Sequence, residues 1–340
     1  MDHLTVTKKH LIKEENLKKM KTFLYQKEIA TKAELAEAAN ISVVTSNALV
    51  KELVESGVFL EGAQVQQEMG RPATNYYFNY NHQHYLLFSI QEKKQQLQVK
   101  VRVVNLKGIV RLEKEEDFSA VDVNQLVALS KELYEEVPSI MTIGISFPGK
   151  MAGDIVTSSW YDRMNGWNFK KSINEEVNLP VYIQNDANLA TIGYCIDQGI
   201  PKMYLVTGIY YPEKSMPGVS IFVNNYLLVG NQGLAGEAKY LPMFLNQEDT
   251  RTISFEQYSK NLIDLITLYN GVAAPHTVVI FKSGYDFSAV EVKQQLEETE
   301  GYVRQPNRPE IKVTDSFDEN VFKGIQWLAM KESIYFNTFS

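Results

Sequence analysis

The apolar positions of the first 57 residues recur at helical spacing in three successive segments. Residues 16–25 place four apolar side chains on one helical face. Thr31 and Glu34 have the spacing of a capping box, which predicts a short second helix. Ser42 can cap a third helix that stops at Gly57. Two helices joined by a tight turn, the second beginning with polar residues, are typical of a helix-turn-helix.

A change to strand-type patterning follows this helical part. Residues 58–60 indicate a strand, residues 62–68 a polar hairpin, and residues 75–79 a second strand after a Gly-Arg-Pro turn. Three helices followed by a β-hairpin predict a winged helix-turn-helix over residues 1–80.

The remaining chain alternates strands with helices, after three strands that follow each other directly. This order favours an α/β body of two lobes. The expected strands cover residues 85–90, 97–104, 109–115, 141–147, 203–207, 219–223 and 278–281, and the expected helices 122–136, 255–269 and 321–336.

The segment 181–190 carries the strongest candidate for a site. An apolar strand there ends in Asn185 and Asp186, immediately before residues with helical spacing. Open α/β sheets bind ligands at the carboxyl ends of their strands, where these two side chains would lie. The alternative is that both residues only form a turn and cap the helix.

Composition narrows the class of protein. The chain has 340 residues, 44% of them hydrophobic, which is enough for two or three domains. Cys195 is the only cysteine, which excludes an internal disulfide and a thiolate zinc site. No apolar run is long enough to cross a membrane and the start does not have the pattern of a signal peptide, so a cytoplasmic protein is expected.

Charge is distributed unevenly between the two parts. Residues 1–80 hold ten basic and ten acidic residues, so the net charge of −7 comes from 24 basic and 31 acidic residues beyond them. Six lysines lie between residues 8 and 21. A basic edge on an otherwise acidic protein suits DNA binding at one end, although a solvated helix face would give the same pattern.

The third predicted helix supplies most of the candidate DNA contacts. Apolar and amide groups at its start can read base edges, hydroxyls can bond phosphate, and an arginine at the base of the wing can enter a minor groove. A protein-interaction module of three helices is the alternative. The candidate residues are Val43, Val44, Thr45, Ser46, Asn47, Lys51 and Arg71.

Several motifs resemble the ROK family of repressors and sugar kinases. Residues 35–45, 52–57 and 70–72 resemble the DNA-binding domain of ROK-family repressors, with Ala48 where a basic residue is frequent. The ordered motifs of the sugar-kinase-like domain are found at residues 144–149, 165–167, 185–188 and 233–237.

The resemblance implies a fold and a set of ligand contacts. The fold is α/β, an N-terminal winged helix-turn-helix followed by a two-lobed actin-like (ribonuclease-H-type) sugar-kinase-like body over residues 81–340. The lobes would divide near residue 185 and hold a sugar between them. By position, Asn185 and Glu237 would bond sugar hydroxyls, Asp186 would be the catalytic base of a kinase, and Glu256 would be a second sugar-binding glutamate. Tyr240 stands where the family has a zinc-binding histidine beside the sugar, and either replaces it as a hydroxyl partner or fills the gap.

The turns that a kinase of this kind needs for phosphate are altered. Phosphoryl transfer requires backbone amides around the phosphates, which glycine-rich turns supply. Residues 89–94 have no glycine and include Glu92, residues 207–217 keep only Thr207-Gly208 at their start, and residues 281–284 lack the expected Gly-Gly. The cysteine-rich zinc segment is replaced by residues 246–252.

These features predict a transcriptional regulator that is not an enzyme and holds no cofactor or metal. Its expected partners are a double-stranded DNA operator and a sugar or sugar phosphate effector, and it is expected to act as a homodimer or tetramer. One alternative is a regulator whose body no longer binds sugar. The other is an active sugar kinase with a DNA-binding appendage.

Overall fold

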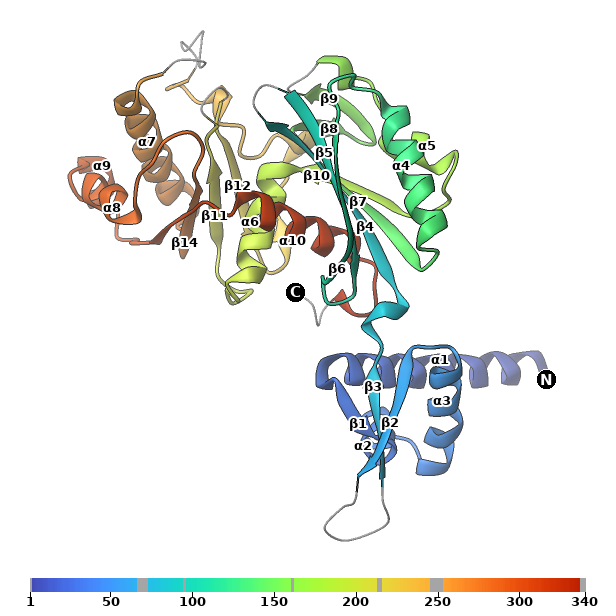
Figure 1. Cartoon of the computed structure of the whole chain (residues 1–340). Helices are drawn as coiled ribbons and strands as arrows, with labels where there is room; N and C mark the ends of the chain where they lie inside the picture. The colour runs from blue at the N-terminus through green and yellow to red at the C-terminus, as the bar shows by residue number, and fades with distance from the viewer. Residues whose placement is uncertain are drawn as a thin grey trace.

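The computed structural model describes residues 2–65, 73–93, 96–159, 162–212, 216–244 and 253–336. The chain forms a small N-terminal module and a larger body of two lobes (Figure 1). No helix among these residues combines the length and the apolar character that crossing a membrane requires.

The N-terminal module packs three helices against a three-stranded antiparallel sheet of order β1-β3-β2. The first helix begins well before the predicted residue 16, and the second strand runs on through Gly62 to Val65. The rest of the predicted hairpin, with Arg71, lies outside the described residues. The elements are α1 (Asp2–Lys27), β1 (Ile29–Thr31), α2 (Lys32–Ala39), α3 (Val43–Glu55), β2 (Phe59–Val65) and β3 (Ala73–Phe78).

Both predicted helix caps in this module are confirmed. The Thr31 hydroxyl accepts from the amide of Glu34, and the Glu34 carboxylate accepts from the amide of Thr31 at 2.7 Å. The Ser42 hydroxyl accepts from the amide of Thr45 at 3.2 Å. These bonds satisfy amides that the first helical turn leaves open, so local sequence determines where α2 and α3 begin.

The first lobe contains a mixed five-stranded sheet of order β10-β7-β4-β5-β6. β4, β5 and β6 are antiparallel neighbours, as three successive strands predict, whereas β4, β7 and β10 are parallel. The strands are β4 (His84–Lys93), β5 (Gln96–Asn105), β6 (Val110–Asp117), β7 (Ile140–Phe147), the hairpin of β8 (Gly149–Ala152) and β9 (Ile155–Ser159), and β10 (Val181–Asn185). The helical segments are η1 (Tyr80–His82), α4 (Val123–Glu136), η2 (Asp162–Met164) and α5 (Phe169–Asn174).

The second lobe has its own five-stranded sheet, of order β13-β12-β11-β14-β15. β11 begins at Val206, so the prediction of a strand from residue 203 was wrong by three residues. The strands are β11 (Val206–Tyr210), β12 (Gly218–Val223), β13 (Tyr226–Leu227), β14 (Thr277–Phe281) and β15 (Glu310–Thr314). The helical segments are η3 (Asn231–Gly233), η4 (Ala238–Tyr240), α7 (Phe255–Ala273), α8 (Ala289–Glu297) and α9 (Glu300–Val303).

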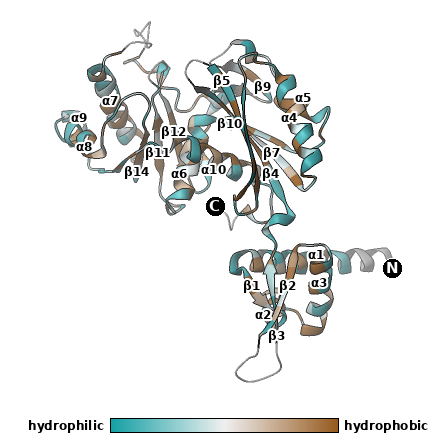
Figure 2. Ribbon diagram, viewed as in Figure 1, coloured by the Kyte–Doolittle hydropathy of each residue, from teal (hydrophilic) through white to brown (hydrophobic). Residues whose placement is uncertain are grey.

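Two helices lie between the sheets and pack on each other, α6 (Asp186–Asp197) and α10 (Phe317–Ala329) (Figure 1). Gly193 and Gly324 allow the backbones to touch, because a Cβ on Gly193 would meet the carbonyl oxygen of Asn320 at 1.8 Å. α10 also packs on β4 and β7 of the first lobe, so it contacts both halves of the body. It ends at Ala329, earlier than the predicted residue 336. The sheet strands beside these helices are mainly hydrophobic (Figure 2).

The N-terminal module and the body share one continuous hydrophobic core. The Tyr25 hydroxyl donates to the carbonyl of Leu106 at 3.1 Å, and the Tyr80 hydroxyl donates to the carbonyl of Tyr25 at 2.6 Å. Lys107 forms an ion pair with Glu28 at 2.5 Å. The module is therefore packed onto the body, not only tethered to it.

Candidate functional site

A cavity of about 1160 Å³ lies between the two lobes. Its wall includes the carboxyl end of β10, the β8 strand, the end of β11, and the starts of α6 and α10. A cleft at the carboxyl ends of sheet strands is where open α/β proteins bind their ligands.

Asn185 both caps α6 and lines this cavity. Its Oδ1 accepts from the amides of Ala187 at 3.0 Å and Asn188 at 3.3 Å, and its Nδ2 donates to the carbonyl of Gly149 at 3.2 Å. The interpretation of a helix cap is therefore confirmed. The same bonds hold the amide group against the β8 strand, at the wall of the cavity.

Asp186 is the first residue of α6 and also lines the cavity. Its Oδ1 accepts from the amide of Ala187 at 2.8 Å. Burial of the carboxylate raises the pKa of Asp186 to about 6, in spite of this bond. A carboxyl group in this environment can accept from a ligand hydroxyl when ionised and donate when protonated.

Glu237 lines the cavity from the second lobe and makes an ion pair with Lys150 of β8 at 2.6 Å. The Lys150 side chain is only 15% exposed and that of Glu237 is 25% exposed. The pair therefore joins the two lobes across the cavity. Sequence reasoning missed Lys150, although a charged residue directly after the Pro148-Gly149 turn at the end of a predicted strand was the available signal.

Two of the five candidate sugar ligands do not line the cavity. Tyr240 is 59% exposed, and its ring lies beside the ammonium groups of Lys150 and Lys239. Glu256 is exposed in the first turn of α7, away from the cavity wall. Neither residue belongs to the lining of the cavity, so their roles as sugar ligands stay predictions from their position in the motif.

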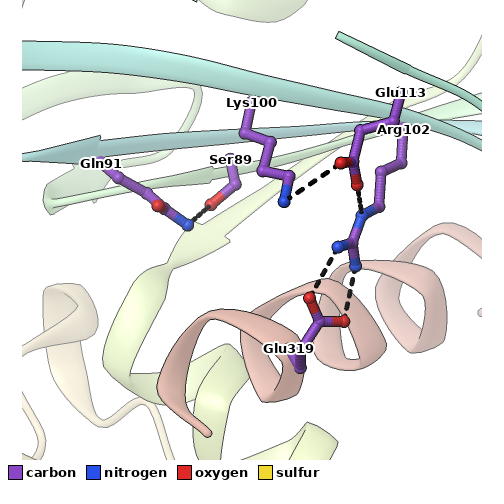
Figure 3. A network of polar contacts seen from close by, with 6 residues as sticks. All are labelled: Ser89, Gln91, Lys100, Arg102, Glu113 and Glu319. Atoms are coloured by element: carbon purple, nitrogen blue, oxygen red, sulfur yellow. Dashed lines mark hydrogen bonds and ion pairs between the residues drawn. The ribbon is translucent and has the colours of Figure 1, made fainter. Parts of the chain in front are cut away.

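An ion-pair network lies near Ser89 and Gln91, in the segment where a kinase of this kind would have its first phosphate-binding turn (Figure 3). The Arg102 guanidinium donates to Glu113 at 2.5 Å and to both carboxylate oxygens of Glu319, at 2.6 and 2.7 Å. Lys100 lies 3.3 Å from Glu113. This network links β5 to the first turn of α10 and places two carboxylates there.

The strands at this turn remain paired nearly to its tip. β4 and β5 keep their register from His84 opposite Asn105 to Lys93 opposite Gln96. The Gln91 side chain donates to the hydroxyl of Ser89 at 2.8 Å. The structure does not describe the side chain of Glu92, the carboxylate that the altered turn of residues 89–94 includes.

The places of the other two altered turns hold a close packing contact and a pair of ion pairs. Gly208 lies within β11, and a Cβ there would meet the Thr191 hydroxyl of α6 at 1.8 Å, so packing requires this glycine. Lys282, after β14, pairs with Asp286 at 2.8 Å and lies 3.5 Å from Asp315.

In the N-terminal module, the start of α3 presents apolar side chains to solvent. Val43 is 53% exposed and Val44 is 80% exposed, and Thr45, Asn47 and Lys51 are exposed as well. The side chains at the start of α3 are therefore free of contacts that would bury them in the module.

Ser46 does not share this surface. Its side chain is fully buried, and its hydroxyl donates to the carbonyl of Lys32 at 3.2 Å. The prediction that Ser46 bonds phosphate is therefore wrong, because the residue packs α3 on α2.

The basic edge of α1 is partly neutralised within the module. Lys13 pairs with Glu52 at 2.8 Å and Lys19 with Glu15 at 2.8 Å. Exposed pairs of this kind are weak, so these lysines can exchange a carboxylate for a phosphate at small cost.

Among the described residues, no three His, Cys, Asp or Glu side chains gather as a metal site would need. Cys195 is buried in α6, and burial raises the pKa of its thiol to about 12. The segment that replaces the zinc ligands, residues 246–252, lies outside the described residues.

In a comparison with protein-family models, the model of the ROK family matches residues 100–250. The xylose repressor of Bacillus subtilis is 24% identical over 257 residues, which cover 68% of this chain and 62% of the repressor. A beta-glucoside kinase of Listeria monocytogenes is 30% identical over 153 residues, 42% of this chain and 49% of the kinase. The chain thus spans about half to three fifths of these curated relatives, which include both a repressor and a kinase.

Solved structures support the same fold along nearly the whole chain. A ROK family transcriptional regulator described as a homologue of the E. coli MLC protein aligns with a TM-score of 0.61 and 14% identity, covering 96% of this chain and 98% of that one. A ROK family protein from Streptococcus pneumoniae in complex with sucrose aligns with a TM-score of 0.58 and 16% identity, covering 73% of this chain and 99% of that one. The mixed α/β sugar-kinase-like fold of the body is confirmed.

Proposed function

We propose that this protein is a sequence-specific DNA-binding regulator of carbohydrate-metabolism genes, acting as a repressor, whose body binds a sugar or sugar phosphate without phosphorylating it. The observation that carries the proposal is the exposed start of α3, in a module whose core continues into a body with an interlobe cavity. We assign the module as a winged helix-turn-helix and α3 as its recognition helix.

The composition of α3 supports reading of a major groove. Val43 and Val44 can contact thymine methyl groups, Asn47 can pair with adenine, and Thr45 or Lys51 can contact phosphate. The similarity to a xylose repressor extends over two thirds of the chain and agrees with this assignment.

The polar groups of the cavity support a sugar as the ligand. Asn185, Asp186 and Glu237 come from different segments and all line the cavity. Amides and carboxylates form paired hydrogen bonds with neighbouring hydroxyls, which is the recognition chemistry that a sugar requires.

Three features argue against phosphoryl transfer in this cavity. The strand pairing of β4 and β5 uses backbone groups that a phosphate turn would present, and Gly208 is required for packing. Pro212 and Pro217, which line the cavity between β11 and β12, have no amide hydrogen to donate. Because kinases are also among the matched relatives, sugar-dependent ADP release should be measured directly, and we expect none.

The structure offers a route from the cavity to the DNA-binding module. A ligand that binds one arrangement of the lobes more tightly shifts the population toward that arrangement. α10 contacts both lobes, and the segment after it reaches the module through Tyr335. Movement of the lobes can therefore change the position of the recognition helices.

A regulator whose body binds no sugar is the second candidate. The exposed positions of Tyr240 and Glu256 outside the cavity lining, and the ion pair that engages Glu237, favour it. In that case a panel of sugars leaves the melting temperature unchanged, whereas a true ligand at 100 times its Kd adds about 2.7 kcal/mol to the free energy of unfolding.

We further propose a cytoplasmic homodimer or tetramer that binds an inverted repeat, because helix-turn-helix proteins read paired half-sites with two modules. The test is selection of bound fragments from the source genome by the purified protein, with and without sugars and sugar phosphates. Recovery of an inverted repeat near sugar-uptake genes, lost with one sugar, supports the proposal. Recovery that no sugar changes favours the second candidate, and the absence of any specific fragment at moderate salt contradicts the assignment of the module.

A further inference from the structure

The cavity has a second end, formed by aromatic side chains of the second lobe. Tyr210, at the end of β11, stacks on Phe317, at the start of α10, with ring centroids 3.9 Å apart and planes 16° apart. Phe281, at the end of β14, packs edge-on against Phe317 with centroids 5.6 Å apart. Tyr210 and Phe317 both line the cavity and are half-buried.

This aromatic end lies next to the sugar-binding end. Gly218 packs on Ala187, the residue after Asp186, because a Cβ on Gly218 would lie 3.5 Å from the Ala187 Cβ. Tyr210 is the ladder partner of Gly218. Tyr210 therefore lies one strand spacing, about 4.8 Å, beyond Gly218 along the edge of the sheet.

Apolar residues that lie in sequence between β11 and β12 line the cavity as well. They are Pro212, Met216 and Pro217, and the two prolines lack an amide hydrogen. Such a wall suits the face of a ring better than a phosphate. The cavity of about 1160 Å³ is also larger than one monosaccharide fills, since pockets for drug-sized ligands measure about 300–1,000 Å³.

We infer that the effector has two rings, a sugar ring on Asn185 and Asp186 and a second ring against Tyr210 and Phe317. The ligand class is a glycoside, either a disaccharide or a sugar with an aromatic aglycone. This inference rests on the proposed function and specifies its ligand. Ser283 and Asp318, which line the same end of the cavity, supply polar partners for hydroxyls of the second ring.

The experiment measures binding of the full chain by calorimetry, in matched series. Each series contains a monosaccharide, a disaccharide of it and its 4-nitrophenyl glycoside, for glucose, galactose and xylose. In one series we expect the two-ring member to bind about tenfold more tightly than the monosaccharide, as an added ring contact predicts. Tighter binding of the disaccharide identifies the second ring as a sugar. Tighter binding of the nitrophenyl glycoside alone identifies the second ring as an aromatic aglycone.

Two variants separate the second ring from general effects on the fold. Phe317→Leu should bring the ratio of the two Kd values toward one. Phe255→Leu is the matched control, because Phe255 is a 46% exposed phenylalanine of α7 outside the cavity wall, and it should keep the ratio. A monosaccharide that binds as tightly as its two-ring relatives overturns the inference and leaves the proposed function standing. Absence of binding by every series overturns the inference, whereas the sugar-binding part of the proposed function is tested separately by the fragment selection with sugars and sugar phosphates.

Discussion

The ring of Tyr335 stacks on the ring of Tyr25, with centroids 4.8 Å apart and planes 20° apart. Tyr25 belongs to α1 of the N-terminal module, and Tyr335 follows α10 of the body. Phe78 of β3 meets both rings edge-on, at 5.3 Å from each. Burial raises the pKa of Tyr25 and of Tyr335, so both stay neutral at physiological pH. The contact is therefore an apolar joint between the two parts of the chain.

Tyr335→Ala should loosen this joint. Removing a buried aromatic ring costs about 3–5 kcal/mol. We expect one cooperative thermal transition to separate into two, with the module unfolding first, and the DNA response to sugar to weaken. Tyr335→Phe keeps the ring and should lose no more than about 1.5 kcal/mol. A single unshifted transition in Tyr335→Ala would show that the stack does not couple the two parts.

Asp186→Asn should change how stability depends on pH. The pKa of Asp186 is raised from 3.8 to about 6 by burial, so the folded protein holds this proton more tightly than the unfolded chain does. The free energy of unfolding therefore falls as the pH rises from about 4 to 6, by up to about 3 kcal/mol. Asn carries no charge, so the variant should be the more stable protein at pH 7.5 and should lack this slope in urea unfolding.

Asp197→Asn, at the other end of α6, is the matched control for that measurement. A hydrogen bond from Lys323 lowers the pKa of Asp197, so its carboxylate stabilises the fold above its ordinary pKa. The pair is 45% and 40% exposed, and solvent screening limits its contribution to less than about 1 kcal/mol. At pH 7.5, Asp186→Asn should therefore raise the free energy of unfolding and Asp197→Asn should lower it. Changes of equal sign would refute the raised pKa of Asp186.

The starts of helices could be predicted from the sequence where a nearby residue caps them. Which side chains line the cavity could be predicted only in part. Thr31 and Ser42 determine helix starts through bonds to residues three positions away, which the sequence displays directly. Asn185 and Asp186 line the cavity because a strand end and a helix start fix their place. The place of Glu256 depends on the path of the chain between η4 and α7, which no local pattern determines.

The sequence pattern also could not predict which single polar residues are buried or paired. Ser46 lies one position from exposed Thr45 and Asn47, and it is buried because Lys32 of α2 offers a carbonyl at that point of α3. Lys150 could not be paired with Glu237, because their contact joins segments 87 residues apart in different lobes.

Gly193→Ala should disrupt the crossing of α6 and α10. The added Cβ would lie 1.8 Å from the carbonyl oxygen of Asn320 and 2.7 Å from its carbonyl carbon, both backbone atoms that cannot turn aside. Overpacking of this kind costs at least about 2 kcal/mol or prevents folding. Gly271→Ala in α7 is the control, because its nearest neighbour is a side-chain atom at 3.4 Å and alanine favours a helix by up to about 1 kcal/mol. Urea unfolding should place Gly193→Ala well below the wild-type chain and Gly271→Ala at or above it.

Asn47→Ala and Lys51→Ala should separate base reading from phosphate binding in α3. Both side chains are exposed and one turn apart, and Lys51 lies 3.7 Å from Glu55 in a pair that solvent weakens. An amide that pairs with adenine contributes about 1–3 kcal/mol of discrimination, so Asn47→Ala should reduce affinity for the selected operator far more than for random DNA. A lysine on phosphate acts on every sequence, so Lys51→Ala should weaken both equally and reduce the slope of log K against log salt by about one. Equal loss on both DNAs in Asn47→Ala would place Asn47 on the phosphate backbone, and α3 would then orient the module without reading the sequence through this residue.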